Sequence, residues 1–266
     1  MNSTRLASES EIVLTVQRGM HVLRAFRSDT KSLSNTELVR NTGLSKATIS
    51  RLTSTFVELG FLRRSPGGRQ FELSTGPLSI GNSYVETSPL LRHAHPFMQE
   101  LANRLNVSVA LAAPEQLDML YVAYRISRKI ATLRLGIGSI FSMGDTAIGR
   151  AYLWGLDPHE RVKTISALKN AAGDDGLALE RSINASFDEL RQGGTCFVLS
   201  DSGYRRDAFG VALPVRVGLQ RSLMGLSCAA VEVGPRLETT RKRVAHALKN
   251  AAPQFEEAMA QVDCDA

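Results

Sequence analysis

Four polar or cationic residues lie close together early in the chain, at spacings that suit the exposed side of one helix: Ser45, Lys46, Thr48 and Arg51. Lysine and arginine can donate to the acceptors on a guanine edge, whereas serine and threonine bind phosphates or base edges. Short side chains also let a helix approach DNA closely. The group therefore predicts contact between a helix and the major groove of double-stranded DNA.

Three arginines follow soon afterwards: Arg63, Arg64 and Arg69. The runs at 61–64 and 70–73 flank Ser65-Pro66-Gly67-Gly68, a pattern that predicts a β-hairpin. Cations on such a hairpin contact backbone phosphates or the minor groove, and they add affinity without reading much sequence. Residues 40–70 carry a net charge of +5, so most of the basic excess lies where a phosphate-facing surface is expected.

The elements expected to position these side chains form a helix-turn-helix. Ser34 and Glu37 have the spacing of a capping box and begin one helix. Gly43 ends that helix, because glycine tolerates the left-handed conformation found there. Ser45 then caps the next helix, whose apolar residues recur every three or four positions. An earlier helix is predicted over 11–26 from an apolar stripe of Val13, Val16, Met20, Leu23 and Phe26.

The rest of the chain mixes strand-like and helix-like segments. Residues 76–92 predict a connecting helix, and Ser88-Pro89 opens another helix that continues to about Leu105. Two groups of strands around a helical middle imply an α+β domain. Strands are predicted at 107–113, 119–125, 131–136, 196–200, 210–217 and 223–233, and helices from 157, at 177–192 and from 235, the last broken or kinked at Pro253.

Length and composition favour two folded domains without a cofactor. A chain of 266 residues exceeds the usual size of one domain. Its three cysteines are odd in number and widely spaced, which favours reduced thiols and predicts neither a disulfide framework nor a metal site. No apolar window is long enough to span a membrane, and the first residues do not resemble a signal peptide, so we expect a cytoplasmic protein without membrane contact.

Catalytic motifs are missing from the sequence. Neither H-E-x-x-H nor G-x-S-x-G occurs, and residues 76–83 have the glycine spacing of a phosphate loop but carry Asn82 in place of its lysine. We therefore expect that the protein is not an enzyme. An architectural DNA-binding protein that needs no ligand, and less favourably a small-molecule enzyme, remain as alternatives.

The basic segment resembles the IclR family of bacterial regulators. The resemblance lies in Ser34–Val39, Thr42–Thr48, Arg51-Leu52, Leu59–Leu62 and Phe71–Ser74. It continues through Gly136–Ser139, Gly144–Ala151, Gly210–Val215 and Leu226–Cys228, so that it covers roughly residues 12–260. It implies an N-terminal winged helix-turn-helix joined by a helical linker to a GAF-like α+β effector-binding domain.

The resemblance also implies a transcriptional regulator whose operator binding is modulated by a small organic effector, often an aromatic or other carboxylic acid. By position, the amides of Ala147 and Ile148 are candidate ligand donors at a helix start. Asp201 and Cys228 are expected to line the far wall, and Phe141 and Met143 to supply apolar contacts. Asp145 lies beside this helix start, where its carboxylate could cap the helix itself.

The sequence also predicts where the domains begin and end, and that the protein self-associates. We expect a flexible arm at 1–11, the DNA-binding domain at 12–75, a linker helix at 76–92 and the effector-binding domain at 93–262. One recognition helix reads too few base pairs for genomic specificity, so a homodimer or a dimer of dimers is predicted.

Overall fold

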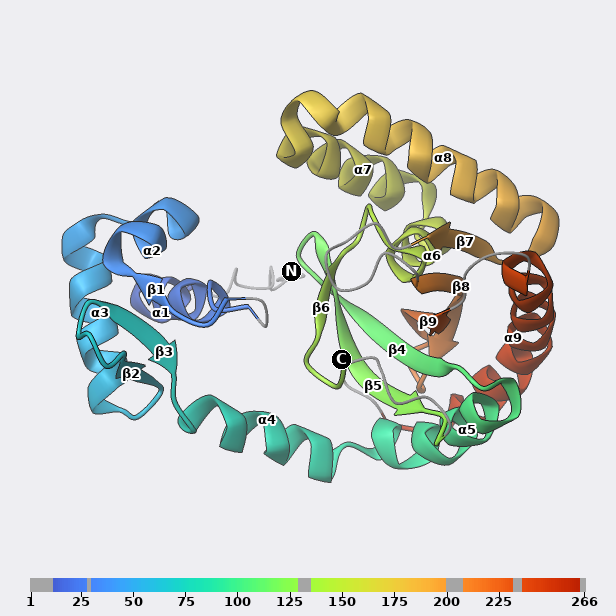
Figure 1. Ribbon diagram of the computed structural model, residues 1–266, viewed down its shortest axis with the longest axis horizontal. Coiled ribbons are helices and arrows are strands. Elements are labelled where there is room, and N and C mark those ends of the chain that lie inside the picture. The colour runs from blue at the N-terminus through green and yellow to red at the C-terminus, as the bar shows by residue number, and fades with distance from the viewer. Residues whose placement is uncertain (1–11, 28–29, 129–134, 200–207, 232–235, 264–266) are drawn as a thin grey trace, which may run out of the picture. The chain divides into compact units, whose positions relative to one another are not determined.

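A computed structural model describes residues 12–27, 30–128, 135–199, 208–231 and 236–263 of the chain. The chain divides into two compact units, Met1–Thr87 and Ser88–Ala266 (Figure 1). The expected arm at 1–11 lies outside the described residues. Within the described residues, no helix has both the length and the apolar character needed to cross a membrane.

The first unit is a winged helix-turn-helix, as the sequence predicts. Its three-stranded antiparallel sheet has the order β1-β3-β2, and its core joins Val22, Phe26, Leu38, Ile49 and Phe71. Its elements are α1 (Leu14–Arg24), β1 (Leu33–Ser34), α2 (Asn35–Thr42), α3 (Lys46–Glu58), β2 (Leu62–Arg64), β3 (Gln70–Leu73) and α4 (Gly76–Thr87).

Helix α1 buries only part of its predicted apolar stripe. Val13, Val16 and Met20 of this stripe are 64%, 62% and 46% exposed. The buried side runs instead through Gly19 and Val22, because Gly19 brings the α1 backbone close to the Phe56 ring of α3. The apolar stripe of α1 is therefore only partly used within one chain.

The second unit is an α+β domain around a six-stranded antiparallel sheet with the order β6-β5-β4-β9-β8-β7. This architecture confirms the predicted fold class. Its strands are β4 (Ser108–Glu115), β5 (Asp118–Ile126), β6 (Ile140–Ser142), β7 (Cys196–Leu199), β8 (Ala208–Val217) and β9 (Ser222–Val231). Its helices are α5 (Pro89–Leu105), α6 (Ala147–Gly155), α7 (Pro158–Ala172), η1 (Gly173–Asp175), α8 (Gly176–Gly193) and α9 (Leu237–Met259).

Helices cover both faces of this sheet (Figure 1). Helices α6 and α8 share one core cluster with the sheet, whereas α5 and α9 pack against each other through Phe97 and Phe255, with ring centroids 5.4 Å apart. Ser88 caps α5 as predicted, by accepting from the Leu91 amide. Of the break or kink predicted at Pro253, the break does not occur, because α9 continues through this residue. The strand predicted at 131–136 falls largely outside the described residues.

Candidate nucleic-acid interface and effector site

The start of α3 is held by its own cap. The Ser45 side chain accepts from the Thr48 amide at 3.3 Å, and the two hydroxyls lie 2.9 Å apart. The preceding α2 begins with the predicted capping box between Ser34 and Glu37 and ends at Gly43, whose φ is 69°. Both ends of the turn are thus fixed by local hydrogen bonds, so the exposed side of α3 is presented on a rigid support.

Two cations extend from this support. Lys46 and Arg51 are exposed, and neither forms an ion pair with another residue that the structure describes. On the opposite side, Ile49 and Thr53 are buried, and the Thr53 hydroxyl donates to the Ile49 carbonyl at 2.9 Å. Helix α3 therefore separates a packed side from a side whose cations are available to a polyanion.

The three wing arginines have different surroundings. Arg63 pairs with Glu72 at 2.7 Å across β2 and β3. Arg64 lies over the Phe71 ring, 5.1 Å from its centroid, and its Nη1 is 3.4 Å from the Gly68 carbonyl. Arg69 has no ion pair with any described residue. The Arg63 charge is therefore paired with Glu72 within the wing, whereas the Arg69 charge is available to a phosphate.

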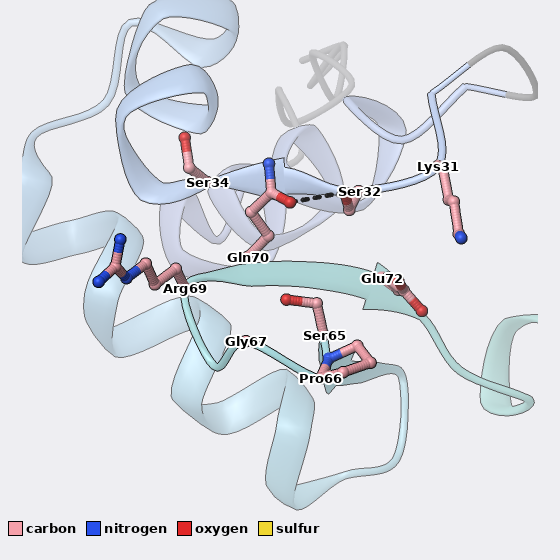
Figure 2. Close-up of a pocket in the computed structure, with 9 residues that line it drawn as sticks. All are labelled: Lys31, Ser32, Ser34, Ser65, Pro66, Gly67, Arg69, Gln70 and Glu72. Atoms are coloured by element: carbon pink, nitrogen blue, oxygen red, sulfur yellow. Dashed lines mark hydrogen bonds between the residues drawn. The ribbon is translucent and has the colours of Figure 1, made fainter.

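A polar groove of about 570 Å³ is lined by residues of β1, of the β2–β3 turn and of β3 (Figure 2). The Ser32 hydroxyl donates to Gln70 Oε1 at 2.9 Å across it. Figure 2 shows the Arg69 side chain at one end and Lys31 at the other. The groove is lined by Lys31, Ser32, Ser34, Ser65, Pro66, Gly67, Arg69, Gln70 and Glu72.

In the second unit, the start of α6 presents two unused amides. The Thr146 hydroxyl caps the helix by accepting from the Gly149 amide at 3.3 Å, and the Thr146 carbonyl accepts from Arg150. Among the described residues, the amides of Ala147 and Ile148 have no acceptor. Asp145 is not the cap, because its carboxylate accepts from the Ser142 hydroxyl at 2.6 Å. The helix start can therefore donate two hydrogen bonds to an anion.

A buried arginine fixes this helix start in place. Arg150 is 9% exposed and forms no ion pair with a described carboxylate. Its Nε donates to the Gly144 carbonyl at 2.7 Å, while its other nitrogens reach Ser182 and Ser186 of α8. Burial lowers the pKa of Arg150, although Cys196 and two nearby carboxylates oppose the shift. Its charge raises the positive potential beside the free amides.

The sheet face toward α6 is lined by small residues. A Cβ added to Gly225 would lie 2.6 Å from Ile148 Cγ1, and one added to Gly210 would lie 3.3 Å from Ala147 Cβ. Strand alternation therefore directs positions 210, 212, 225 and 227 toward α6 and their neighbours to the opposite face. Small residues of this face on β4, β8 and β9 are Ser108, Ala110, Ala112, Gly210, Ala212, Gly225, Ser227 and Ala229, and Pro214 lies on the same face.

Aromatic side chains from β5 and β6 lie beside this small-residue face. The rings of Tyr121 and Phe141 have centroids 4.7 Å apart, and those of Tyr121 and Tyr124 are stacked at 6.1 Å. Burial raises the pKa of Tyr121, and hydrogen bonding with the Ser227 side chain opposes the shift. These aromatic side chains therefore pack together beside the small residues of the α6 face.

Comparison with known protein families assigns both units. Residues 15–66 match the IclR helix-turn-helix domain, and residues 82–257 match the C-terminal domain of the bacterial transcriptional regulator IclR. The chain belongs to the IclR family. It is therefore a DNA-binding transcriptional regulator with an effector-binding domain, and its family consists of regulators and not of enzymes.

Individual IclR relatives extend along most of the chain. The regulator TsaQ1/TsaQ2 of Comamonas testosteroni is 30% identical over 77% of this chain and 74% of its own length. The Pca regulon regulatory protein of Pseudomonas putida is 23% identical over 78% of this chain and 70% of its own.

Solved structures support the same fold. An IclR-family regulator from Brucella abortus has a TM-score of 0.83 at 26% identity and covers 97% of this chain and 96% of its own. An IclR homologue from Microbacterium hydrocarbonoxydans, crystallised with 4-hydroxybenzoate, has a TM-score of 0.60 at 19% identity, covering 92% of this chain and 98% of its own.

The IclR effector domain brings together some of the predicted site residues. Ala147, Ile148, Phe141 and Met143 belong to one core cluster, or pack against it, on the α6 face. Met143 is 1% exposed, and its backbone lies so close to Gly149 that a Cβ there would be 2.1 Å from the Met143 carbonyl oxygen. Asp201 lies outside the described residues.

Cys228 is not brought together with these residues. It pairs with Val109 and Val211 in the sheet, whereas its neighbour Ser227 pairs with Ala110 and Ala212 of the α6 face. Because side chains alternate along a strand, the Cys228 thiol lies on the opposite face of the sheet from Ala147. The structure therefore does not bring the Cys228 thiol to the start of α6, and its neighbour Ser227 is the residue that faces this helix.

Sequence reasoning also overlooked residues that contact the α6 start. The Cys196 thiol lies 3.3 Å from the Ala147 carbonyl, and burial raises its pKa to about 12. Arg150 stands inside the Gly144–Ala151 motif without a predicted role. Small and large residues alternate along much of β8, and this pattern could have predicted which face of the sheet α6 covers. Within the described residues, no group of three or more His, Cys, Asp or Glu is arranged to hold a metal ion.

Proposed function

We propose that this regulator binds a specific operator through α3 and that a small organic acid bound in the second unit changes its affinity for that operator. The observation that carries the proposal is the capped start of α3, from which Lys46 and Arg51 extend without an ion-pair partner among the described residues. Cations on a helix of this kind can reach guanine acceptors in the major groove.

Roles within the DNA surface differ by position. Arg51 and Lys46 are proposed to contact base edges, while Ser45 and Thr48 contact phosphates or bases beside them. On the wing, Arg69 is the stronger candidate for a phosphate contact, because Arg63 is paired with Glu72 and Arg64 is packed on Phe71. Arg63 and Arg64 contribute mainly by holding the wing in shape.

Substitution of Arg51 tests the proposed reading of bases. Arg51→Ala should reduce the preference for upstream DNA of the gene over a scrambled duplex by about tenfold to a hundredfold, since one bidentate base contact is worth about 1–3 kcal/mol. Arg104→Ala, an exposed arginine of α5, is the matched control and should leave the preference unchanged. Equal losses for both variants would exclude α3 as the reading helix.

The effector site is proposed at the start of α6. The amides of Ala147 and Ile148 would hold a carboxylate, and Phe141 and Met143 would supply apolar contacts. Asp201 remains a proposed wall residue. A relative is named an activator of p-hydroxybenzoate hydroxylase transcription, and the Microbacterium homologue was solved with 4-hydroxybenzoate. These names favour an aromatic acid as the effector here.

Self-association is proposed through α1 and α4. Both helices carry apolar side chains that their own unit leaves exposed, and contiguous apolar patches on regulators commonly mark interfaces. A homodimer or a dimer of dimers would cover them and would pair two recognition helices on one operator. Sedimentation at micromolar concentration should show no monomer. The exposed residues of the two helices are Leu14, Val16, Met20, Leu78, Ile80 and Tyr84, and Ile12 and Val13 directly precede α1.

Ligand response separates this proposal from a ligand-independent architectural protein. An effector can change operator affinity only through its different affinities for two states, typically by about 1–3 kcal/mol. A panel of organic acids should therefore contain one that raises the melting temperature and also changes operator affinity. Operator binding that no acid affects would favour the architectural protein.

A further inference from the structure

Two exposed cations lie at opposite ends of the polar groove in the first unit (Figure 2). Lys31 belongs to the segment before β1, and Arg69 belongs to the turn before β3. Neither forms an ion pair with another residue that the structure describes. Of the described residues that line the groove, Glu72 supplies the single carboxylate, which Arg63 neutralises at 2.7 Å. The groove therefore presents a net positive charge to solvent.

Hydrogen-bond donors line the groove between the two cations. The Ser65 hydroxyl and the Gly67 amide form no hydrogen bond with a described residue. Gly67 is exposed, and a Cβ added there would meet open space, so its amide can be approached freely. Hydroxyls, backbone amides and cations are the groups that bind phosphate oxygens in protein–DNA complexes. The lining therefore suits phosphate groups.

The separation of the two cations indicates which kind of anion fits. Leu33 of β1 pairs with Phe71 of β3. Lys31 lies two residues before Leu33, and Arg69 lies two residues before Phe71. Because the strands are antiparallel, these offsets point in opposite directions and add up to four residue spacings, or about 13 Å along the strands. One small anion does not reach both cations, whereas a DNA strand carries a phosphate about every 3.4 Å of helix axis.

We infer that this groove binds the phosphate backbone of one DNA strand, and that Arg69 and Lys31 contact different phosphates of that strand. The contact thereby extends beyond the β2–β3 turn to the segment before β1. Lys31 is then a DNA-binding residue that the hairpin pattern of the sequence did not indicate. This inference rests on the proposed DNA-binding function and adds a second phosphate contact to it.

The salt dependence of DNA binding tests the inference. Fluorescence anisotropy with one labelled duplex at several salt concentrations should be measured for the full chain and its variants. Lys31→Gln should reduce the slope by about 0.9, and its combination with Arg69→Ala should reduce the slope by about 1.8, because each phosphate contact contributes about 0.9. Between about 50 and 200 mM salt, the parent should lose roughly 12-fold more affinity than the double variant.

Two further variants serve as controls. Lys163→Gln removes the charge of an exposed lysine of α7 and should leave the slope unchanged. Lys31→Arg keeps the charge and should also keep the slope of the parent. A slope that Lys31→Gln leaves unchanged, or that Lys163→Gln reduces equally, would overturn the inference. A reduced slope for Lys31→Arg would overturn it too, since the effect would then not follow the charge.

Inorganic pyrophosphate distinguishes a DNA strand from a small anion. If calorimetry shows that pyrophosphate binds the parent but not Lys31→Gln, while the DNA slopes of the two are equal, the groove is a small-anion site and the inference fails. Failure of the proposed function is measured separately. If Lys31→Gln leaves the slope unchanged while Arg51→Ala still reduces the preference for upstream DNA, the proposed function stands and only this refinement fails.

Discussion

Arg69 and Arg63 should contribute differently to the salt dependence of DNA binding, although both lie on the wing. Each phosphate contact lowers the logarithm of the binding constant by about 0.9 per logarithm of salt concentration. Arg69→Ala should therefore reduce the slope by about 0.9. Between about 50 and 200 mM salt, the parent should lose roughly 3.5-fold more affinity than this variant.

The matched control removes a charge pair together. Arg63 and Glu72 lie 2.7 Å apart, so the double variant Arg63→Met with Glu72→Gln leaves the net charge of the wing unchanged. Its slope should equal that of the parent. Fluorescence anisotropy with one labelled duplex at several salt concentrations measures all three slopes, and no operator is needed because phosphate contacts are independent of sequence. An unchanged slope for Arg69→Ala, or an equal reduction in the double variant, would refute the reasoning.

Three further predictions concern stability and reactivity. Ser34→Ala should destabilise the first unit by about 1 kcal/mol, because the capping box is lost. The control variant Ser54→Ala changes an exposed serine and should leave the stability unchanged. Thermal denaturation followed by circular dichroism measures both variants. Gly149→Ala should lower the melting temperature of the second unit strongly, because the new Cβ would lie 2.1 Å from the Met143 carbonyl oxygen, and a normal melting curve would contradict this packing. In a variant with Cys196 as its sole cysteine, thiol labelling at pH 8 should be slow until the chain is unfolded, because burial raises the pKa of this thiol from 9 to about 12. The contribution of the Cys196 thiol to the free energy of unfolding should be complete below pH 9 and lost as the pH rises toward 12.

Local signals explain why much of the fold was predictable from the sequence. A helix cap depends on a few adjacent residues, so Ser34, Ser45 and Ser88 correctly predicted the starts of three helices. Pro253 does not break α9, because the helical pattern continues on both sides of it and outweighs the local penalty.

Features that depend on long-range pairing were harder to predict. The side of α1 that faces the core depends on Gly19 meeting Phe56, a contact that periodicity does not reveal. The sheet face that Cys228 occupies could not be predicted, because a shift of one residue along a strand reverses the face. Sequence therefore located the segments of the effector site better than the side chains that face it.

The most direct test of the central claim is binding of the purified protein to its own upstream intergenic DNA, compared with a scrambled duplex of equal length at about 150 mM salt. A sequence-specific IclR regulator should prefer the native duplex by about a thousandfold or more. Equal and salt-sensitive binding to the two duplexes would contradict recognition of a specific operator in that DNA.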